Sequence, residues 1–528
     1  MKVLLIFPPM PLSFFSYPKL VHHLGCKALL PPLGLITVAA LLPREWRLRL
    51  VDLNVEPVTE EAWDWADLVM LSGMVIQRQG LLALIREAKS RGKTVVVGGP
   101  YANSLPEEVL EAGADFLVLG EGEDVIPLFL EALAQGQRGG VIKCDSRPDL
   151  TASPIPRFDL LNFRNYLNLS IQASRGCPHD CEFCDVVQLY GRRPRYKEPR
   201  QITAELETLF CLGWRGPIFV CDDNFIGNKT HARAILREVT RWSKSRGEPF
   251  IFMTQTTVDL GQDVALIDQM TEANFVEVFI GIESPEEEAL IRSHKHHNYR
   301  IAMEESIETI KANGLSIIGS VILGMDGEQP GTGERIISFI ERTSIPLVMV
   351  NLLQPAPHTR LWQRLQQEGR LLKMENATKP DSIGGQQSFL TSRPREQIMA
   401  EYHQVWETIY EPSRYLERSY RYFLGMRPSR AALARRQGKS LPPAAVSPGK
   451  IPLRQKLWNF YIFLKFSWQL GLVSSTRRQY WRHLLGLAKK NPCRLQGYFV
   501  SCSRGEDMFH LRDVLRQLRQ EASGQRLT

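Results

Sequence analysis

The sequence predicts an α/β protein with two parallel sheets in tandem. We expect an N-terminal doubly wound domain, an open (β/α)6 barrel and a mostly helical C-terminal region. Two series of short apolar runs separated by amphipathic stretches support this, because strands of a parallel sheet covered on both faces are apolar throughout. A chain of 528 residues has room for about three domains. The expected segments are a first domain at 1–145, a linker at 146–167, a barrel at 168–372 and a helical region with a basic, aromatic tail at 373–528.

The first series predicts five strands, with helical stretches such as 80–91 between them. The strands are expected at 3–7, 47–52, 67–73, 94–100 and 115–121. Ligands of such sheets bind at the carboxyl ends of the strands. The residues at or near those ends are small or polar: Asp52, Asn54, Ser72, Gly73, Gly98, Gly99, Gly120 and Glu121.

Two common nucleotide motifs are missing from this domain. Pro8 and Pro9 follow the first strand where a dinucleotide-binding domain has G-x-G-x-x-G, and no G-x-x-x-x-G-K-[ST] is present. A nicotinamide or flavin dinucleotide site is therefore not expected, and a domain that only packs against the rest remains an alternative. Residues 149–157 are rich in Pro and small polar residues, which favours an extended connection.

The second series predicts six strand–helix units. Strands are expected at 169–174, 217–221, 250–256, 276–282, 315–323 and 347–353, with helices at 201–212, 231–245, 264–273, 301–313 and 333–343. Six units are fewer than the eight of a closed TIM barrel, so we expect an open barrel with its site at the carboxyl ends of the strands.

Three cysteines directly follow the first strand of this barrel. Cys177, Cys181 and Cys184 have C-x₃-C-x₂-C spacing, which lets one loop wrap one iron–sulfur cluster. A [4Fe–4S] cluster has four irons, so three thiolates leave one iron open to a small molecule. Zinc usually needs four ligands in paired knuckles, and no second knuckle follows. A disulfide framework would suit a secreted chain, and this chain does not look secreted.

Other barrel strand ends also carry polar groups. Asp222, Asp223 and Asn224 follow the second strand and suit a cation or an ammonium group; the alternative is a helix cap or Asx turn. Glu283 follows the fourth strand and suits a ribose, as acids do at strand ends of nucleotide folds; the alternative is a first-turn helix acid.

The remaining barrel positions give weaker signals. Gly319 and Gly324 on the fifth strand let the backbone approach a flat ring closely. His358, after the sixth strand, suits a surface position better than a substrate-side acid or base. The histidines at 294, 296 and 297 lack partner ligands at metal-site spacing and are expected in a solvated loop. No catalytic acid or base is assigned.

The cysteine loop resembles that of the radical S-adenosylmethionine (SAM) enzymes, whose C-x₃-C-x-aromatic-C motif it matches with Phe183 as the aromatic residue. The resemblance implies a [4Fe–4S] cluster whose open iron is chelated by SAM, which is cleaved to a 5′-deoxyadenosyl radical. It also implies that Asp222, Asp223 and Asn224 lie near the SAM amino group, Glu283 near the ribose, and the stretch with Gly319 and Gly324 near the adenine.

The first domain resembles the cobalamin-binding domain that precedes many radical SAM barrels. Four stretches carry the resemblance: 31–35, 51–54, 98–100 and 119–123. It implies that the eight strand-end residues named above contact cobalamin. The D-x-H-x-x-G motif of other cobalamin enzymes is absent and position 54 is Asn, which implies cobalamin bound without a protein histidine below the cobalt.

Together the two resemblances imply a cobalamin-dependent radical SAM enzyme, similar to the subgroup of hopanoid C-2 methylase and chlorin side-chain methylases. One SAM is then expected to methylate cobalt and a second to generate the radical. The implied activity is methylation of an unactivated carbon of an apolar metabolite of the lipid, hopanoid or tetrapyrrole class. An oxidative or ring-forming enzyme without methyl transfer, and a non-catalytic cobalamin or Fe–S sensor, are the alternatives.

Composition and the C-terminal region bear on partners and compartment. The net charge of +8 suits anionic cofactors, a membrane surface or nucleic acid alike. Scattered cysteines, and no signal peptide or transmembrane run, favour a cytoplasmic protein. Residues 396–424 are expected to be helical and 428–456 to form a mobile link. The basic, aromatic stretch from 457 suits a membrane interface or a helix packed on the barrel, so contact with the inner face of a membrane stays open.

We therefore expect an apolar small-molecule substrate and, by resemblance, an electron donor such as flavodoxin or ferredoxin. No recognised binding module for nucleic acid is present, and no nucleic-acid partner is expected.

Overall fold

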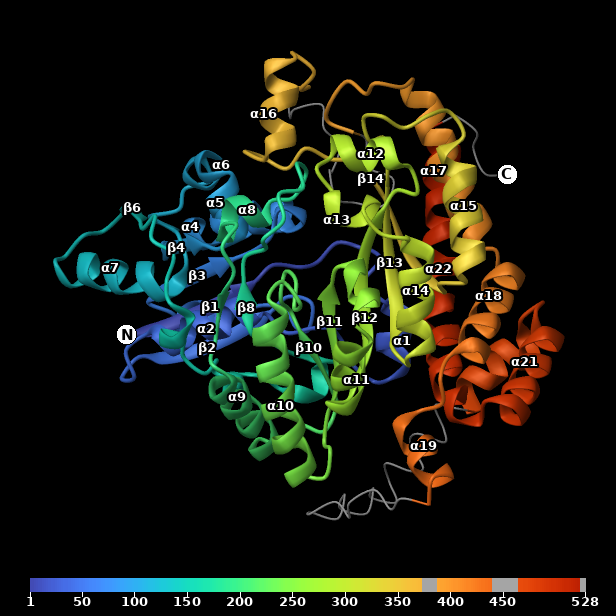
Figure 1. The fold of residues 1–528 in the computed structure, drawn as a ribbon. Coiled ribbons are helices and arrows are strands. Elements are labelled where there is room, and N and C mark those ends of the chain that lie inside the picture. Colours follow the sequence, from blue (N-terminus) through green and yellow to red (C-terminus); the bar gives the residue numbers. More distant parts are fainter. Residues whose placement is uncertain (373–386, 439–463, 523–528) are drawn as a thin grey trace.

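The computed structural model describes residues 1–372, 387–438 and 464–522. It confirms the predicted fold class: two parallel six-stranded sheets in tandem, followed by a helical region. In Figure 1 the N-terminal sheet lies at the left, the barrel sheet in the middle and the C-terminal helices α17, α18, α21 and α22 at the right.

The N-terminal sheet has the strand order β2-β1-β3-β4-β5-β6, with every neighbouring pair parallel. Its strands are β1 (Lys2–Phe7), β2 (Arg47–Asp52), β3 (Leu68–Ser72), β4 (Thr94–Gly98), β5 (Phe116–Leu119) and β6 (Gly140–Lys143). The sequence predicts the first five. Strand β6 lies at the edge and is mostly exposed, so it lacks the apolar pattern of a buried parallel strand.

Helices cover both faces of this sheet. They are α2 (Leu33–Leu41), α3 (Glu60–Trp65), α4 (Arg78–Ser90), α5 (Pro100–Ser104), α6 (Pro106–Glu111) and α7 (Gly122–Ala134), with a short turn η1 (Val75–Gln77). Helix α1 (Pro18–His23) instead packs against α22 (Leu495–Ala522) of the C-terminal region, as Figure 1 shows. Alternate residues of β1 enter two separate cores. Leu4 and Ile6 pack with α3 and α4 on one face, and Val3 and Leu5 pack with α2 and α7 on the other.

The barrel sheet has the order β14-β13-β12-β11-β10-β7 and is also parallel throughout. Its strands are β7 (Leu169–Ile171), β10 (Pro217–Val220), β11 (Ile251–Thr256), β12 (Phe275–Glu283), β13 (Ser316–Leu323) and β14 (Leu347–Leu352). All six fall where the sequence predicts them. A small antiparallel pair, β8 (Ser174–Arg175) and β9 (Arg195–Tyr196), brackets the cysteine loop.

Five helices cover the outer face of the barrel sheet: α9 (Pro199–Cys211), α10 (Lys229–Ser245), α11 (Val264–Glu272), α14 (Met303–Ala312) and α15 (Thr332–Thr343). The short helices α8 (Val186–Tyr190), α12 (Glu287–Arg292), α13 (His296–Tyr299) and α16 (Arg360–Gln367) lie in the connections that follow the carboxyl ends of β8, β12 and β14. The linker contains three short turns, η2 (Leu150–Ala152), η3 (Phe158–Leu160) and η4 (Phe163–Asn165). A further turn, η5 (Val258–Gln262), follows β11.

The C-terminal region packs on the open side of the barrel, next to the edge strand β14. Its described elements are α17 (Arg395–Ile409), α18 (Pro412–Gly425), α19 (Arg430–Arg436), a helical segment at 464–468, a π-helix η7 (Gln469–Val473), α21 (Arg477–Lys490), η8 (Pro492–Arg494) and α22 (Leu495–Ala522). The single helical stretch predicted at 396–424 is two helices, because Pro412 begins a new one. Most of the predicted link at 428–456, and residues 457–463 of the aromatic stretch, lie outside the described residues.

The side chain of Tyr410 covers part of the edge strand β14 of the barrel sheet. Its hydroxyl accepts a hydrogen bond from the Val348 backbone N–H (3.0 Å) and donates one to the Val348 carbonyl (2.6 Å). An uncovered strand edge invites pairing with other chains, and this side chain with α17 covers it. Across the described ranges, no helix has the length and apolar character needed to cross a membrane.

Candidate functional site

The carboxyl ends of both sheets open into one cavity of about 740 Å³. Six of the strand-end residues singled out in the N-terminal domain line it: Ser72, Gly73, Gly98, Gly99, Gly120 and Glu121. The barrel side contributes Gln172, Arg175, Asp185, Tyr190, Asp223 and His358. The volume lies towards the upper end of the range for small-molecule sites, so the cavity has room for a large ligand.

Glycines shape the wall that the N-terminal domain gives to this cavity. Gly99 and Gly120 have φ angles of +88° and +124°, and a Cβ atom there would lie 2.1 Å from Ser72 Oγ and 2.5 Å from the Cys144 carbonyl oxygen. No protein atom lies within 4 Å of the place where a Cβ of Gly34 would stand. The cavity is therefore open directly above Gly34, and this space could hold a broad group such as the corrin ring that the sequence resemblance implies.

Asp52 and Asn54 do not line the cavity, contrary to expectation. Asp52 accepts hydrogen bonds from the Asn54 side chain (2.6 Å) and the Tyr166 hydroxyl (3.1 Å), and Asn54 accepts one from the Met10 backbone N–H (2.7 Å). Burial raises the pKa of Asp52. These hydrogen bonds connect the turn after β2 to the end of β1 and to the linker, so both side chains have a structural role.

Glu121 lines the cavity, but its carboxylate is occupied by arginines from the barrel. Arg175 Nη1 lies 2.9 Å from Glu121 Oε2, and Arg195 Nη2 lies 2.6 Å from Glu121 Oε1. Arg175 also forms two hydrogen bonds of 2.8 Å to Glu123. Burial acts to raise the pKa of Glu123, but Arg175 lowers it to about 2. These four residues, which we call the interdomain clamp, join Glu121 and the first turn of α7, which follow β5, to the strands β8 and β9 that bracket the cysteine loop.

The three cysteines lie on one loop between β8 and α8, and all are free thiols. Burial raises the pKa of all three, that of Cys177 to about 11. Among the described residues, no three His, Cys, Asp or Glu side chains converge on a single metal ion. A cluster does not need that, because each thiolate binds a different iron. A buried thiolate needs a nearby positive charge, which bound iron supplies, so the donor set fits a cluster.

Two anchors hold the cysteine loop in place. Asp223 accepts a hydrogen bond from the Gly176 backbone N–H (2.8 Å), directly before Cys177. Arg364 on α16 donates two hydrogen bonds to Glu182 (3.0 and 2.8 Å), between the second and third cysteines. Gly176 has φ +93°, and a Cβ there would lie 2.9 Å from the Gly191 carbonyl oxygen, so the turn requires glycine.

The three polar residues after β10 have different roles in the fold. Asp222 accepts hydrogen bonds from the backbone N–H groups of Ala173 (2.7 Å) and Ser174 (3.0 Å) and from the Ser174 hydroxyl (2.7 Å). Its carboxylate is therefore used to hold the turn between β7 and β8. Asp223 faces the cavity, and Asn224 Oδ1 is buried without a hydrogen-bond partner. Only these last two keep acceptor capacity for a ligand.

Glu283 ends β12 beside the cysteine loop and has a lysine partner that the sequence did not predict. Its Oε1 lies 2.5 Å from Lys295 Nζ, and both side chains are buried. Burial acts to lower the pKa of Lys295, but the Glu283 carboxylate keeps it above its ordinary value. The backbone of Glu283 has φ +64°, a costly conformation for a side-chain-bearing residue, so the carboxylate is held in a specific place.

The histidine-rich stretch around Lys295 is not the predicted solvated loop. Residues 296–299 form α13, and the ring of His297 stacks on His179 of the cysteine loop with 3.8 Å between ring centroids. Both ring nitrogens of His297 are buried without hydrogen-bond partners. The stretch therefore packs on the cysteine loop and brings Lys295 to Glu283.

Protein side chains fill the space beside Gly319 of β13 and beside Gly324, the residue that follows the strand. A Cβ at Gly319 would lie 2.9 Å from Ile282 Cδ1, and one at Gly324 would lie 2.2 Å from Gln387 Nε2. The absent side chains thus make room for neighbouring protein atoms. Neither glycine faces open space where a flat ring could lie against the backbone, so the structure gives no support to that prediction.

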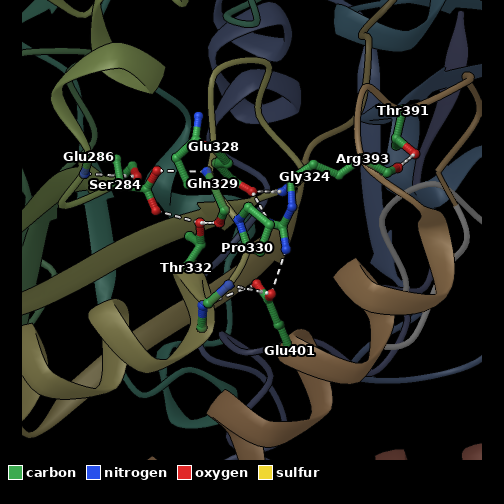
Figure 2. Close-up of polar contacts among 12 residues, drawn as sticks. Ser284, Glu286, Gly324, Glu328, Gln329, Pro330, Thr332, Thr391, Arg393 and Glu401 are labelled. Atoms are coloured by element: carbon green, nitrogen blue, oxygen red, sulfur yellow. Dashed lines mark hydrogen bonds and ion pairs between the residues drawn. The ribbon is translucent and has the colours of Figure 1, made fainter.

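The turn after β13 is instead tied to the C-terminal region, as Figure 2 shows. Glu328 accepts hydrogen bonds from the Gly324 backbone N–H (2.9 Å) and from Arg393 Nη1 (3.2 Å), and Arg393 Nη2 binds Glu401 of α17 at 2.5 Å. Burial raises the pKa of Glu328 to about 7. Glu401 also accepts hydrogen bonds from the backbone N–H groups of Gly331 and Gly333, which fixes the start of α15.

His358 lines the cavity from the loop after β14. Its φ is +65°, the left-handed region that usually selects glycine, and its ring lies 5.5 Å from that of Trp362. It is exposed, as predicted for a surface histidine.

Sequence reasoning missed the arginines and the lysine that pair with the site carboxylates. Arg175, Arg195, Arg393 and Lys295 stand in no motif that predicts these ion pairs. Spacing along the chain carries no signal for such pairs, because the partners lie 12 to 74 residues away.

Three family models match successive parts of the chain. Residues 26–130 match the B12 binding domain, residues 171–340 match the radical SAM superfamily, and residues 359–522 match a domain of unknown function, DUF4070. The first two matches coincide with the two sheets whose strand ends line the cavity.

Two relatives match over nearly their whole lengths. An uncharacterized methyltransferase of Synechocystis sp. is 43% identical over 98% of this chain and 93% of its own length. The hopanoid C-2 methylase of Rhodopseudomonas palustris is 35% identical over 92% of this chain and 89% of its own length. Among solved structures, the cobalamin-dependent S-adenosylmethionine radical enzyme OxsB covers 99% of this chain and 81% of its own with a TM-score of 0.59; at 14% identity this likeness shows the fold alone.

Replacing Arg175 with Ala should strongly destabilise the folded chain. It leaves the buried carboxylate of Glu123 without its arginine partner, while Glu121 keeps Arg195, and breaking a buried pair in this way typically costs about 3–5 kcal/mol. Denaturant unfolding at neutral pH measures the free energy of unfolding. Arg157→Ala is the matched control, because its pair with Asp159 is half exposed and contributes at most about 1 kcal/mol. Equal losses in the two variants would contradict the clamp.

The Asp222→Asn variant should change how stability depends on pH. Burial raises the pKa of Asp222 from its ordinary 3.8 to about 6. The folded chain therefore keeps this proton to higher pH than the unfolded chain, so the group's contribution to stability falls as pH rises from about 4 to about 6. Relative to the Asn variant, the native chain should lose about 2–3 kcal/mol over that interval. Parallel stability–pH curves for the two proteins would refute this assignment.

Proposed function

The chain belongs to the family of cobalamin-dependent radical SAM methylases, and from that premise we propose that it methylates an unactivated carbon of a hopanoid-type polycyclic lipid. The observation that carries the proposal is the shared cavity: strand ends of the B12-matching domain and of the radical SAM barrel open into one space. Cofactors bound by the two domains would face each other across it.

The proposed ligand sets follow from the geometry. Cys177, Cys181 and Cys184 would hold a [4Fe–4S] cluster. Asp223, Asn224 and Glu283 are the proposed SAM contacts, because these side chains lie at the strand ends nearest the cysteine loop. The proposed cobalamin contacts are the six strand-end residues that line the cavity: Ser72, Gly73, Gly98, Gly99, Gly120 and Glu121. Asp222, Asp52, Asn54, Gly319 and Gly324 keep structural roles in this proposal.

Methylating an sp³ carbon explains why such cofactors are needed. That carbon is not nucleophilic, so acid–base groups of the protein cannot activate it. When bound, the cluster with SAM supplies a radical that can remove a hydrogen atom, and cobalamin supplies a transferable methyl group. The protein's own task is to orient the reactants and exclude water. The interdomain clamp serves that task by fixing the loop at Glu121 against the strand before Cys177.

The hopanoid class is supported by the relative named for it. The hopanoid C-2 methylase matches 92% of this chain at 35% identity, so the likeness extends beyond the two cofactor-binding domains into the C-terminal region. We further propose a one-electron donor of the flavodoxin or ferredoxin type, a cytoplasmic location suited to nine unpaired cysteines, and contact with the membrane in which such lipids reside.

Anaerobic turnover with SAM carrying a deuterated methyl group tests the activity. The protein is reconstituted with iron, sulfide and cobalamin, reduced, and supplied with a hopanoid extract. We expect a lipid product that carries the label, together with S-adenosylhomocysteine and 5′-deoxyadenosine. A lipid changed without label, with 5′-deoxyadenosine but no S-adenosylhomocysteine, would favour an oxidative or ring-forming reaction. If SAM stayed intact under every condition, the result would favour a non-catalytic sensor.

Cys181→Ala should lose the cluster and SAM cleavage together. The two remaining thiolates cannot hold three irons of the cluster, so iron and sulfide content after reconstitution should fall to background. Cys211→Ala is the control, because that thiol is exposed and lies outside the loop. Full iron content in Cys181→Ala would contradict the ligand assignment.

A further inference from the structure

Basic residues are concentrated in the C-terminal region. Residues 418–505 contain 18 Lys and Arg and no Asp or Glu, although the whole chain has a net charge of only +8. Some of these cations are used within the fold, such as Arg418 with Glu341 and Arg504 with Glu277. Others lie on α21, at the right-hand edge of the molecule in Figure 1, where the region faces solvent.

The same segment exposes large apolar side chains. Trp468 and Leu485 are 63% and 61% exposed, the highest values for any large apolar side chain in the described ranges. Leu472, Val473 and Trp481 are 53%, 57% and 41% exposed. Single exposed apolar side chains are ordinary, but a contiguous group marks an interaction surface.

Contacts between η7 and α21 place these side chains next to one another. The Trp481 indole N–H donates a hydrogen bond to the Gly471 carbonyl (2.9 Å), and a Cβ at Gly471 would lie 2.8 Å from the Trp481 ring. Trp481 therefore bridges the two segments. The inner face of α21 is used for folding, with Tyr480, His483 and Leu487 buried.

The outer face of α21 alternates cations with apolar groups. Arg478, Trp481, Arg482, Leu485 and Lys489 occupy positions i, i+3, i+4, i+7 and i+11 and so share one side of the helix. Within the described ranges, Arg477, Arg478 and Lys489 have no acidic partner within ion-pair distance. Arg482 lies 3.5 Å from Glu417, the acid that also contacts His483.

We propose that this face, formed by η7 and the outer side of α21, docks on an anionic lipid bilayer. Unpaired Arg and Lys side chains are attracted to anionic headgroups, and Trp and Leu beside them insert at the boundary with the acyl chains. The phosphates of RNA would attract the cations, but RNA would not bury the exposed Leu and Val side chains. A second copy of this basic face would repel the first. The proposal gives a function to part of the region matched by the domain of unknown function.

Vesicle co-sedimentation of the full-length protein tests the proposal without turnover, so its outcome does not depend on the proposed substrate. We expect sedimentation with vesicles of phosphatidylglycerol and phosphatidylcholine, loss of binding as salt is raised, and little binding to phosphatidylcholine alone. The double variants Arg477→Gln/Arg478→Gln and Leu472→Ser/Val473→Ser should each weaken partitioning about tenfold. Circular dichroism melting confirms that each variant is folded.

Matched controls separate this face from general surface effects. Arg241→Gln/Arg342→Gln removes two exposed cations elsewhere, and Leu110→Ser/Leu128→Ser removes two exposed apolar side chains of the N-terminal domain. Both controls should bind vesicles like the native chain. Equal losses in controls and face variants would overturn the proposal, as would equal binding to neutral vesicles.

Two further measurements test the other occupants of this face. Light scattering over a concentration series shows whether the chain self-associates, and a mobility shift with single-stranded RNA shows nucleic-acid binding. Self-association abolished by Leu472→Ser/Val473→Ser, or RNA binding without vesicle binding, would overturn the lipid assignment.

Discussion

The buried ion pairs around Arg175 are the interaction on which the site depends. Parallel sheets place their ligand-binding ends at one edge, but nothing in either sheet makes those edges face each other. Arg175 and Arg195 come from the strands that bracket the cysteine loop, and Glu121 and Glu123 from the N-cap and first turn of α7, directly after β5. A buried pair of this kind adds little net stability, yet it penalises any arrangement that leaves one partner uncompensated. It therefore selects one placement of the cofactor-binding loops.

Arginine–carboxylate pairs also fix the barrel side of the site. Arg364 of α16 donates hydrogen bonds to Glu182 inside the cysteine loop, and Arg393 connects the turn after β13 to α17. The C-terminal region thus supports the site from outside while Tyr410 covers the edge strand β14. A radical intermediate requires a site that excludes water and holds its reactants still, and a barrel open at one edge needs such additions.

Much of the architecture was predictable because apolar periodicity reports burial directly. All six barrel strands were placed from it, and so was the cysteine loop after the first of them. The edge strand β6 could not be predicted, because it is mostly exposed and lacks that periodicity. Roles at strand ends were harder to predict. Asp222 and Asp223 are adjacent in sequence, but one is consumed by backbone N–H groups of Ala173 and Ser174 and the other faces the cavity. Only the fold distinguishes them, as it alone pairs Lys295 with Glu283.

An anaerobic crystal structure of the reconstituted protein with cobalamin and a SAM analogue tests the central claim most directly. We expect both cofactors in the one cavity, the cluster on Cys177, Cys181 and Cys184, and the corrin against the glycine wall at Gly34 and Gly99, with the clamp intact between them. Cobalamin bound outside this cavity, or a cluster loop turned away from it, would show that the two domains do not share one site.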